Sequence, residues 1–164
     1  MLIFMKILLV IFLFPVISLF AQEYDYAVMT DTSLVYTLRL DKGDDIKRSL
    51  EQFAVKHSIS SGALLTCVGS VQNLAVRFAM KNTIDTIRGP LEIVSVTGTI
   101  ASSGVHVHIA AGDNSGKVQG GHLEYGTHVM MTAEIIIMVY PPIMFKRTID
   151  AKTGFPILQI QKNE

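Results

Sequence analysis

Three histidines lie close together in a short glycine-rich stretch of the sequence. They are His106 and His108, which one residue separates, and His122, which follows the pair Gly120-Gly121. Alternate residues of a β-strand project from the same face, so His106 and His108 point their imidazoles in one direction if this stretch is a strand. Two neighbouring imidazoles are well suited to bind a metal ion.

The face of the sheet to which His122 points depends on how the strand after the turn at residues 113–116 pairs with the strand before it. With a four-residue hairpin loop there, Gly112 pairs with Lys117 and His122 falls on the wrong face of the returning strand. One inserted residue corrects this, because a β-bulge shifts side-chain facing by one position. Glycine reaches backbone angles closed to other residues. The sequence therefore predicts a bulge, or an equivalent bend, at Gly120-Gly121.

Three neutral imidazoles that converge from two strands fit a divalent metal, Zn²⁺ best, with Ni²⁺, Cu²⁺ or Fe²⁺ also allowed by ligand type. A fourth coordination position is then open to water or to a small ligand. The alternative is structural: a His-x-His pair on a strand is common without a metal, and histidines can also shape an oligomer axis. Of the other two histidines, His57 is expected at a helix end and His128 on a strand at a surface or subunit contact.

A catalytic metal site also needs a group that moves protons or orients the ligands. The candidates are Glu134, Glu124 and Asp113, and with one of them the site could serve a metal-dependent hydrolase or lyase. Each also has a simpler role, since Asp113 opens a turn, Glu124 can face solvent, and Glu134 can pair with Arg77 or Arg88. No complete acid–base set is visible, so catalysis is the alternative to simple ligand binding.

The first 21 residues resemble a secretory signal peptide. Lys6 precedes an apolar run from Ile7 to Phe20, which is short for the roughly 20 residues that a membrane-spanning helix needs. We therefore expect cleavage near Ala21 and export to the periplasm or the medium. Contact with a membrane is expected only if this leader stays uncleaved. The predicted organisation is a signal peptide at 1–21, a flexible lead-in at 22–33 and one domain at 34–164.

The charge and cysteine content narrow the function further. Without Lys6, 13 Lys and Arg face 14 Asp and Glu. Nucleic acid is therefore an unpromising partner, because nonspecific DNA affinity comes mainly from cations that neutralise phosphates. Cys67 is the single cysteine of the sequence, so no disulfide forms within the chain. It lies in an apolar run and is expected to be a buried small hydrophobic residue.

The elements that position the histidines follow from the periodicity of the apolar residues. A strand is predicted over Leu34–Leu40, and a helix from about Asp45 to His57 with Asp44 as its cap. The remaining pattern predicts strands over 63–69, 72–80, 91–101, 105–111, 117–123 and 129–140, with short strands at 145–149 and 156–161.

The predicted fold class is α+β, with one principal helix against a mostly antiparallel sheet or partly closed barrel. Residues Ile135–Val139 are apolar on both faces of their strand. A sheet that one helix half covers cannot bury both faces, so this run favours barrel closure together with a subunit interface.

Several segments together resemble one known family. They are Gly69-Ser70, Gly-Pro-Leu-Glu-Ile at 89–93, His-x-His at 106–108, Gly-Gly-His-Leu at 120–123 and Thr-Ala-Glu at 132–134. On these motifs the chain resembles the plant- and prokaryote-conserved domain family, whose members are often described as predicted DNA-binding proteins. The resemblance runs from about Val35 to Tyr140.

The resemblance implies an antiparallel α+β fold that assembles as a homotrimer, and a metal bound by His106, His108 and His122, as in bacterial and archaeal members. It also implies kinship of fold with acetolactate decarboxylase, which does not establish an activity. The chain departs from the DNA-binding members because it has no AT-hook and carries an export signal. The expected function is therefore an exported homotrimer that binds a divalent metal and an unidentified small ligand, with DNA binding as a further alternative.

Overall fold

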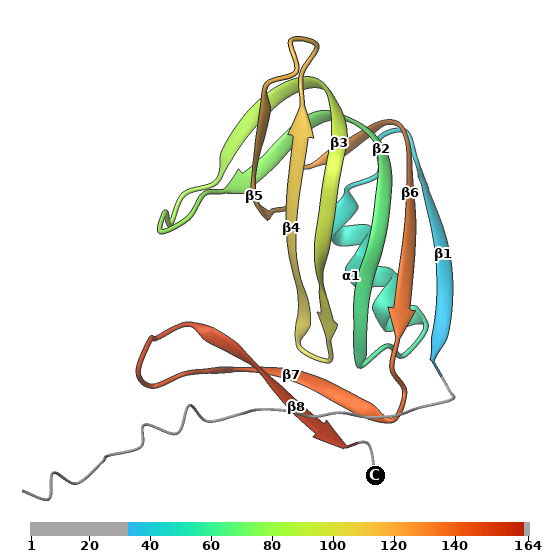
Figure 1. Ribbon diagram of the computed structural model, residues 1–164, viewed down its shortest axis with the longest axis vertical. Coiled ribbons are helices and arrows are strands. Elements are labelled where there is room, and N and C mark those ends of the chain that lie inside the picture. Colours follow the sequence, from blue (N-terminus) through green and yellow to red (C-terminus); the bar gives the residue numbers. More distant parts are fainter. Residues whose placement is uncertain (1–32, 163–164) are drawn as a thin grey trace, which may run out of the picture.

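The computed structural model describes residues 33–162, which form one helix and eight strands (Figure 1). In chain order these are β1 (Leu34–Asp41), α1 (Ile46–Lys56), β2 (Ser61–Arg77), β3 (Asp85–Ala101), β4 (Gly104–Gly112), β5 (Val118–Leu123), β6 (His128–Val139), β7 (Ile143–Ile149) and β8 (Pro156–Lys162). The predicted signal peptide lies outside the described residues, as does the lead-in apart from Ser33. No helix within 33–162 has both the length and the apolar character to span a membrane.

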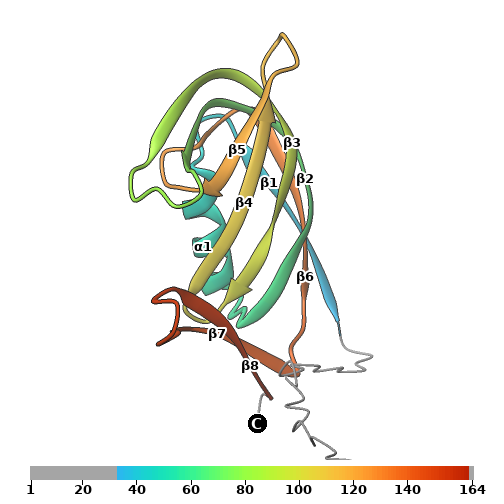
Figure 2. The same ribbon diagram turned by 60° about the vertical axis from the view of Figure 1, so that its left-hand side comes forward.

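Six strands form one antiparallel sheet in the order β1-β6-β2-β3-β4-β5. The far edge of this sheet curls back, because β5 also pairs with the end of β2, through Val76 with Leu123 and Arg77 with His122. Strands β2, β3, β4 and β5 therefore close into a ring, while β6 and β1 extend the sheet on one side (Figure 2). The predicted α+β class with a partly closed barrel is confirmed.

Strand β2 is one long strand where the sequence pattern predicts two. Its pairing with β6 shifts register between Leu64 and Thr66 and again between Gly69 and Val71. At the second shift Gly69 has φ +146°, and a Cβ there would collide with the Thr132 carbonyl oxygen. Such bulges bend a strand without ending it. The alternation of apolar residues is interrupted at residues 70–71 because the side chains there change the face of the sheet to which they point. The backbone nevertheless continues as one strand up to its pairing with β5.

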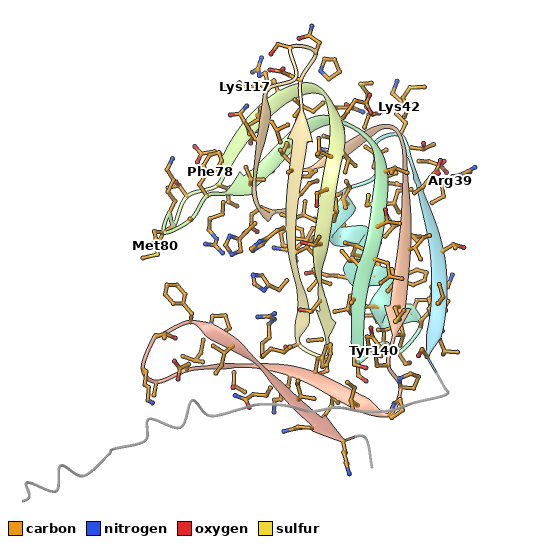
Figure 3. All side chains as sticks on the ribbon, in the orientation of Figure 1. Arg39, Lys42, Phe78, Met80, Lys117 and Tyr140 are labelled. Atoms are coloured by element: carbon orange, nitrogen blue, oxygen red, sulfur yellow. The ribbon has the colours of Figure 1, made fainter. Side chains whose placement is uncertain are left out.

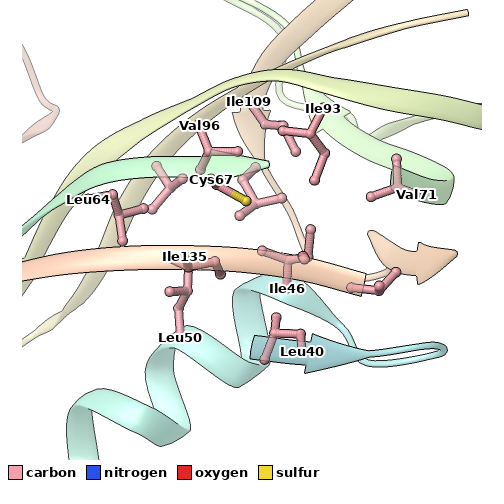
Figure 4. Close-up of a cluster of buried hydrophobic side chains, with 14 of the residues drawn as sticks. Leu40, Ile46, Leu50, Leu64, Cys67, Val71, Ile93, Val96, Ile109 and Ile135 are labelled. Atoms are coloured by element: carbon pink, nitrogen blue, oxygen red, sulfur yellow. The ribbon is translucent and has the colours of Figure 1, made fainter. Parts of the chain in front are cut away.

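Helix α1 covers one face of the sheet (Figure 4). Asp45 caps its start, and the Asp45 carboxylate accepts a hydrogen bond from the Arg48 amide at 3.0 Å. Prediction had placed the cap at Asp44, whose carboxylate instead accepts from the Asp41 amide. Ile46 and Leu50 are completely buried, one turn apart, against the sheet.

The core lies between α1 and the sheet. From β4 it takes Val107, Ile109 and Ala111, so the intervening residues of β4 face the opposite side of the sheet. Cys67 is 5% exposed within this core, and its burial raises the pKa of the thiol to about 11. The prediction that Cys67 is a buried small hydrophobic residue is confirmed.

Strands β7 and β8 form a separate antiparallel hairpin across one end of the main sheet (Figure 1). Two backbone hydrogen bonds of 2.9 Å attach Phe145 to the sheet, one from the Ser102 amide and one to the Ser60 carbonyl. Ile143 and Phe145 pack with Ala101 in a second, smaller apolar cluster. The two short terminal strands predicted from sequence are therefore present, and they lie beside the histidine-bearing end of β4.

Candidate metal centre

His122 lies directly opposite His108 on the paired strands β4 and β5. The register from His108–His122 to Gly112–Val118 is regular, so the described strands contain no bulge at Gly120-Gly121. That prediction is wrong in its position. The change in register lies instead in the turn that joins β4 to β5.

The hairpin loop has three residues, 114–116, instead of four. Asp113 donates its amide to the Lys117 carbonyl at 3.0 Å, and Gly116 donates to the Asp113 carbonyl at 2.9 Å. Gly116 has φ +81°, which completes a type I turn followed by a left-handed residue. The Asp113 carboxylate stabilises the turn by accepting from Ser115 and from the Lys117 amide. An odd number of loop residues aligns His122 with His108.

The three imidazoles converge on one point. Ring centroids are 4.4 Å apart for His108 and His122, 5.1 Å for His106 and His108, and 5.3 Å for His106 and His122. One ring nitrogen from each lies within 4.8 Å of the other two. The nitrogen ligands of a tetrahedral zinc lie about 3.3 Å apart, given zinc–nitrogen bonds of about 2.0 Å. Three imidazole nitrogens within 4.8 Å of one another are close to that spacing, and imidazole is a preferred zinc ligand, so the donor set fits a divalent metal.

The environment of His106 and His122 favours the neutral form of these two imidazoles. Burial, followed by the charge of Arg147, lowers the pKa of His106 from its ordinary 6.5 to about 4. Burial and the charge of Arg77 also lower the pKa of His122. A neutral imidazole has a free nitrogen lone pair for a metal, whereas a protonated one has none. Both side chains are therefore in their metal-binding form at neutral pH.

The backbone of β2 orients His122. The Nδ1 atom of His122 lies 3.3 Å from the Arg77 carbonyl oxygen. When Nδ1 carries the proton, it donates to that carbonyl and leaves Nε2 free as a ligand atom. The ring closure between β2 and β5 thus serves the site, because it brings this carbonyl to the edge of the histidine cluster.

Gly120 and Gly121 allow β5 to approach its two neighbours closely. A Cβ at Gly120 would collide with the Ile109 carbonyl oxygen, and one at Gly121 would lie 2.8 Å from the Arg77 carbonyl oxygen. The double glycine therefore has a positional role, although not the predicted one of forming a bulge. It lets β5 fit between β4 and the end of β2.

The three candidate carboxylates lie at different distances from the histidines along the fold. Glu124 is two residues from His122, and it is held in ion pairs with Lys47 at 2.7 Å and Arg77 at 3.5 Å. Asp113 stabilises the turn at the far end of the β4–β5 hairpin. Glu134 is exposed on β6, which β2 and β3 separate from β4. The structure brings none of the three into a clear proton-transfer position.

The two remaining histidines lie elsewhere. His57 ends helix α1, and its ring packs 4.3 Å from the Phe53 ring. His128 begins β6, with Nδ1 at 3.3 Å from the Asn73 side-chain oxygen. The helix-end position of His57 and the strand position of His128 are as predicted from sequence.

A cavity of about 600 Å³ opens beside the histidines. His106 and His122 line one side, the turn between β2 and β3 lines another, and Arg147 and Phe155 of the C-terminal hairpin line a third. Figure 3 shows Phe78 and Met80 on that turn, which projects on the same side as the hairpin. Sequence reasoning missed Arg147, because no local pattern links it to residues some 40 positions earlier.

Residues 30–141 match the model of the Plants and Prokaryotes Conserved (PCC) domain. The chain is also 36% identical over 133 residues to the bifunctional protein GlmU of a Synechococcus species. That alignment covers 81% of this chain and 21% of the relative. The chain thus spans about a fifth of the length of that curated relative.

Three solved structures share the fold. A hypothetical protein from Salmonella enterica is 29% identical with a TM-score of 0.79, covering 83% of this chain and 99% of that one. A proposed DNA-binding protein from Bacteroides thetaiotaomicron is 25% identical with a TM-score of 0.69, covering 76% and 91%. A metal-containing protein from Archaeoglobus fulgidus is 25% identical with a TM-score of 0.68, covering 77% and 93%.

Proposed function

The chain belongs to the Plants and Prokaryotes Conserved domain family, and from this premise we propose that it binds one divalent metal, Zn²⁺, through His106, His108 and His122. The observation that carries the proposal is the convergence of three imidazole nitrogens at one end of the β4–β5 hairpin. The similar protein from Archaeoglobus fulgidus is described as metal-containing, which supports the same conclusion. A zinc ion held by three protein ligands keeps one coordination position open and can polarise a bound oxygen atom.

The chain's own residues prepare this site for a small ligand. Arg77 orients His122 through its backbone carbonyl, and the cavity beside His106 is within the size range of small-molecule sites. Ligand binding is favoured over catalysis because the nearest candidate carboxylate, Glu124, is already paired with two cations. We do not propose the activity of the Synechococcus relative for this chain, since the match covers about a fifth of the length of that relative.

Zinc titration tests the proposal directly. Protein freed of metal with a chelator and then titrated with Zn²⁺ is expected to bind one equivalent per chain, because each chain carries its own three ligands. Metal analysis by mass spectrometry of the dialysed sample measures the stoichiometry. A sample that retains no zinc above the buffer background would overturn the proposal.

We also propose that the chain assembles as a homotrimer. The sheet face opposite α1 exposes Leu65, Val68, Val94 and Met131 on adjacent strands, each at least 50% exposed in the single chain. Large apolar side chains exposed on neighbouring strands of one sheet favour a contact surface there. Sedimentation equilibrium is expected to give three times the chain mass, and a monomeric mass at micromolar concentration would contradict the assembly.

Export is proposed on the sequence of residues 1–21 alone. N-terminal sequencing of the protein recovered from expressing cells is expected to start at Gln22, and a start at Met1 or Met5 would contradict cleavage. DNA binding is not proposed, although a similar structure is described that way. The 14 Lys and Arg residues are balanced by 14 Asp and Glu residues, so no net positive charge favours binding to phosphates.

A further inference from the structure

The cavity beside the histidines is lined by positively charged side chains. Arg77, Lys81 and Arg147 line it, and none of its lining residues is acidic. Arg77 is paired with Glu124, and Lys81 with Asp85 at 3.3 Å. Within residues 33–162, Arg147 has no carboxylate within ion-pair distance. Its positive charge therefore remains uncompensated at the cavity.

Neutral groups hold the Arg147 guanidinium in place. One terminal nitrogen donates to the Thr99 hydroxyl at 3.0 Å, and the other lies 3.4 Å from the Pro156 carbonyl oxygen. Its Nε atom is buried and has no hydrogen-bond partner. A partly buried cation without an anion is costly, so an anionic group that enters the cavity gains a strong charge-assisted interaction.

Arg147 lines the same cavity as two of the three histidines. It lies on β7, lines the same cavity as His106, and its charge contributes to the low pKa of that histidine. A ligand in the cavity can therefore contact the guanidinium at one end and the histidine site at the other. The cavity volume of about 600 Å³ lies within the range of small-molecule sites and leaves room for a small organic acid.

We propose that Arg147 binds the carboxylate of a small organic acid in this cavity, while a second oxygen of the same acid reaches the metal held by the three histidines. This proposal rests on the proposed metal site. A singly charged carboxylate fits better than a phosphate, because Arg147 is the one cation of the lining without a carboxylate partner. Arg147 also lies beyond residues 30–141, so a segment outside the family match supplies this specificity.

Glycolate, which has one carboxylate and one neighbouring hydroxyl, is the probe. Its binding is followed by the amide chemical shifts of ¹⁵N-labelled protein, in the zinc-loaded and metal-free forms. Wild type is expected to bind in both forms, more tightly with zinc. Arg147→Gln is expected to raise the Kd by about 10-fold to 100-fold in both, as expected for loss of a charge-assisted hydrogen bond. The matched control is Arg39→Gln, since Arg39 is exposed on β1 away from the cavity.

The Nε–H signal of Arg147 in the wild-type protein gives a readout that needs no variant. This signal is expected to shift when glycolate saturates the site. An unchanged Kd in Arg147→Gln, an unmoved Nε–H signal, or tighter binding of inorganic phosphate than of glycolate would overturn the proposal. Failure of zinc binding alone would overturn the metal proposal, and the metal-free titration would still decide the role of Arg147.

Discussion

Replacing Gly120 with alanine is expected to destabilise the protein by about 2–3 kcal/mol and to weaken zinc binding at the same time. A Cβ at this position would collide with the Ile109 carbonyl oxygen and would lie 2.9 Å from the Ala110 Cα. Both obstacles are backbone atoms of β4, which cannot rotate away as a side chain can. Strand β5 must therefore move outward, and His122 moves with it away from His108.

Urea unfolding measures the stability of this variant, and zinc titration measures its site. Gln119→Ala is the matched control, since it changes the preceding residue of the same strand without adding an atom near β4. The control is expected to stay within about 0.5 kcal/mol of wild type. If Gly120→Ala were as stable as Gln119→Ala and bound zinc equally well, the close approach of β5 would not be what positions His122.

Replacing His108 with alanine is expected to lower zinc affinity by on the order of 100-fold or more. Loss of a residue that merely supports a ligand already costs roughly 10-fold to 100-fold, and His108 would be a ligand itself. Its ring is 4.4 Å from that of His122 and 5.1 Å from that of His106, so it lies in the middle of the cluster. Its side chain is exposed, so its removal is expected to leave the stability of the metal-free protein nearly unchanged.

Competition with a chelator of known zinc affinity measures this loss, and circular dichroism checks that the fold is retained. His128→Ala provides the control, because His128 also lies on a strand of this sheet but contacts Asn73 instead of the cluster. Equal losses in His108→Ala and His128→Ala would mean that the zinc is not bound by the three converging histidines.

The parts of this fold that follow local periodicity could be predicted from sequence. The spacing of His106 and His108 predicted that both lie on one face of a strand, and the structure places the alternating residues Val107 and Ile109 in the core. The helical spacing of Ile46 and Leu50 predicted α1 and its buried side. These predictions succeed because a residue's facing within one element depends only on its position along that element.

Features that depend on exact loop length or on distant contacts could not be predicted in the same way. The sequence of the turn allows a four-residue loop at 113–116, which pairs Gly112 with Lys117, and a three-residue loop at 114–116, which pairs Asp113 with Lys117. Because the loop was counted as one residue too long, the change in register was predicted at Gly120-Gly121, whereas the structure has it in the turn that contains Gly116. Arg147 was missed for a different reason, because it reaches the cavity only through the packing of Phe145 against the end of the sheet.

Anomalous diffraction at the zinc absorption edge, from crystals of the zinc-loaded protein, tests the central claim most directly. The account predicts one strong peak per chain within coordination distance of ring nitrogens of His106, His108 and His122, at about 2.0 Å from each. A strong peak bounded by other residues, or the absence of any peak at the three histidines, would contradict it.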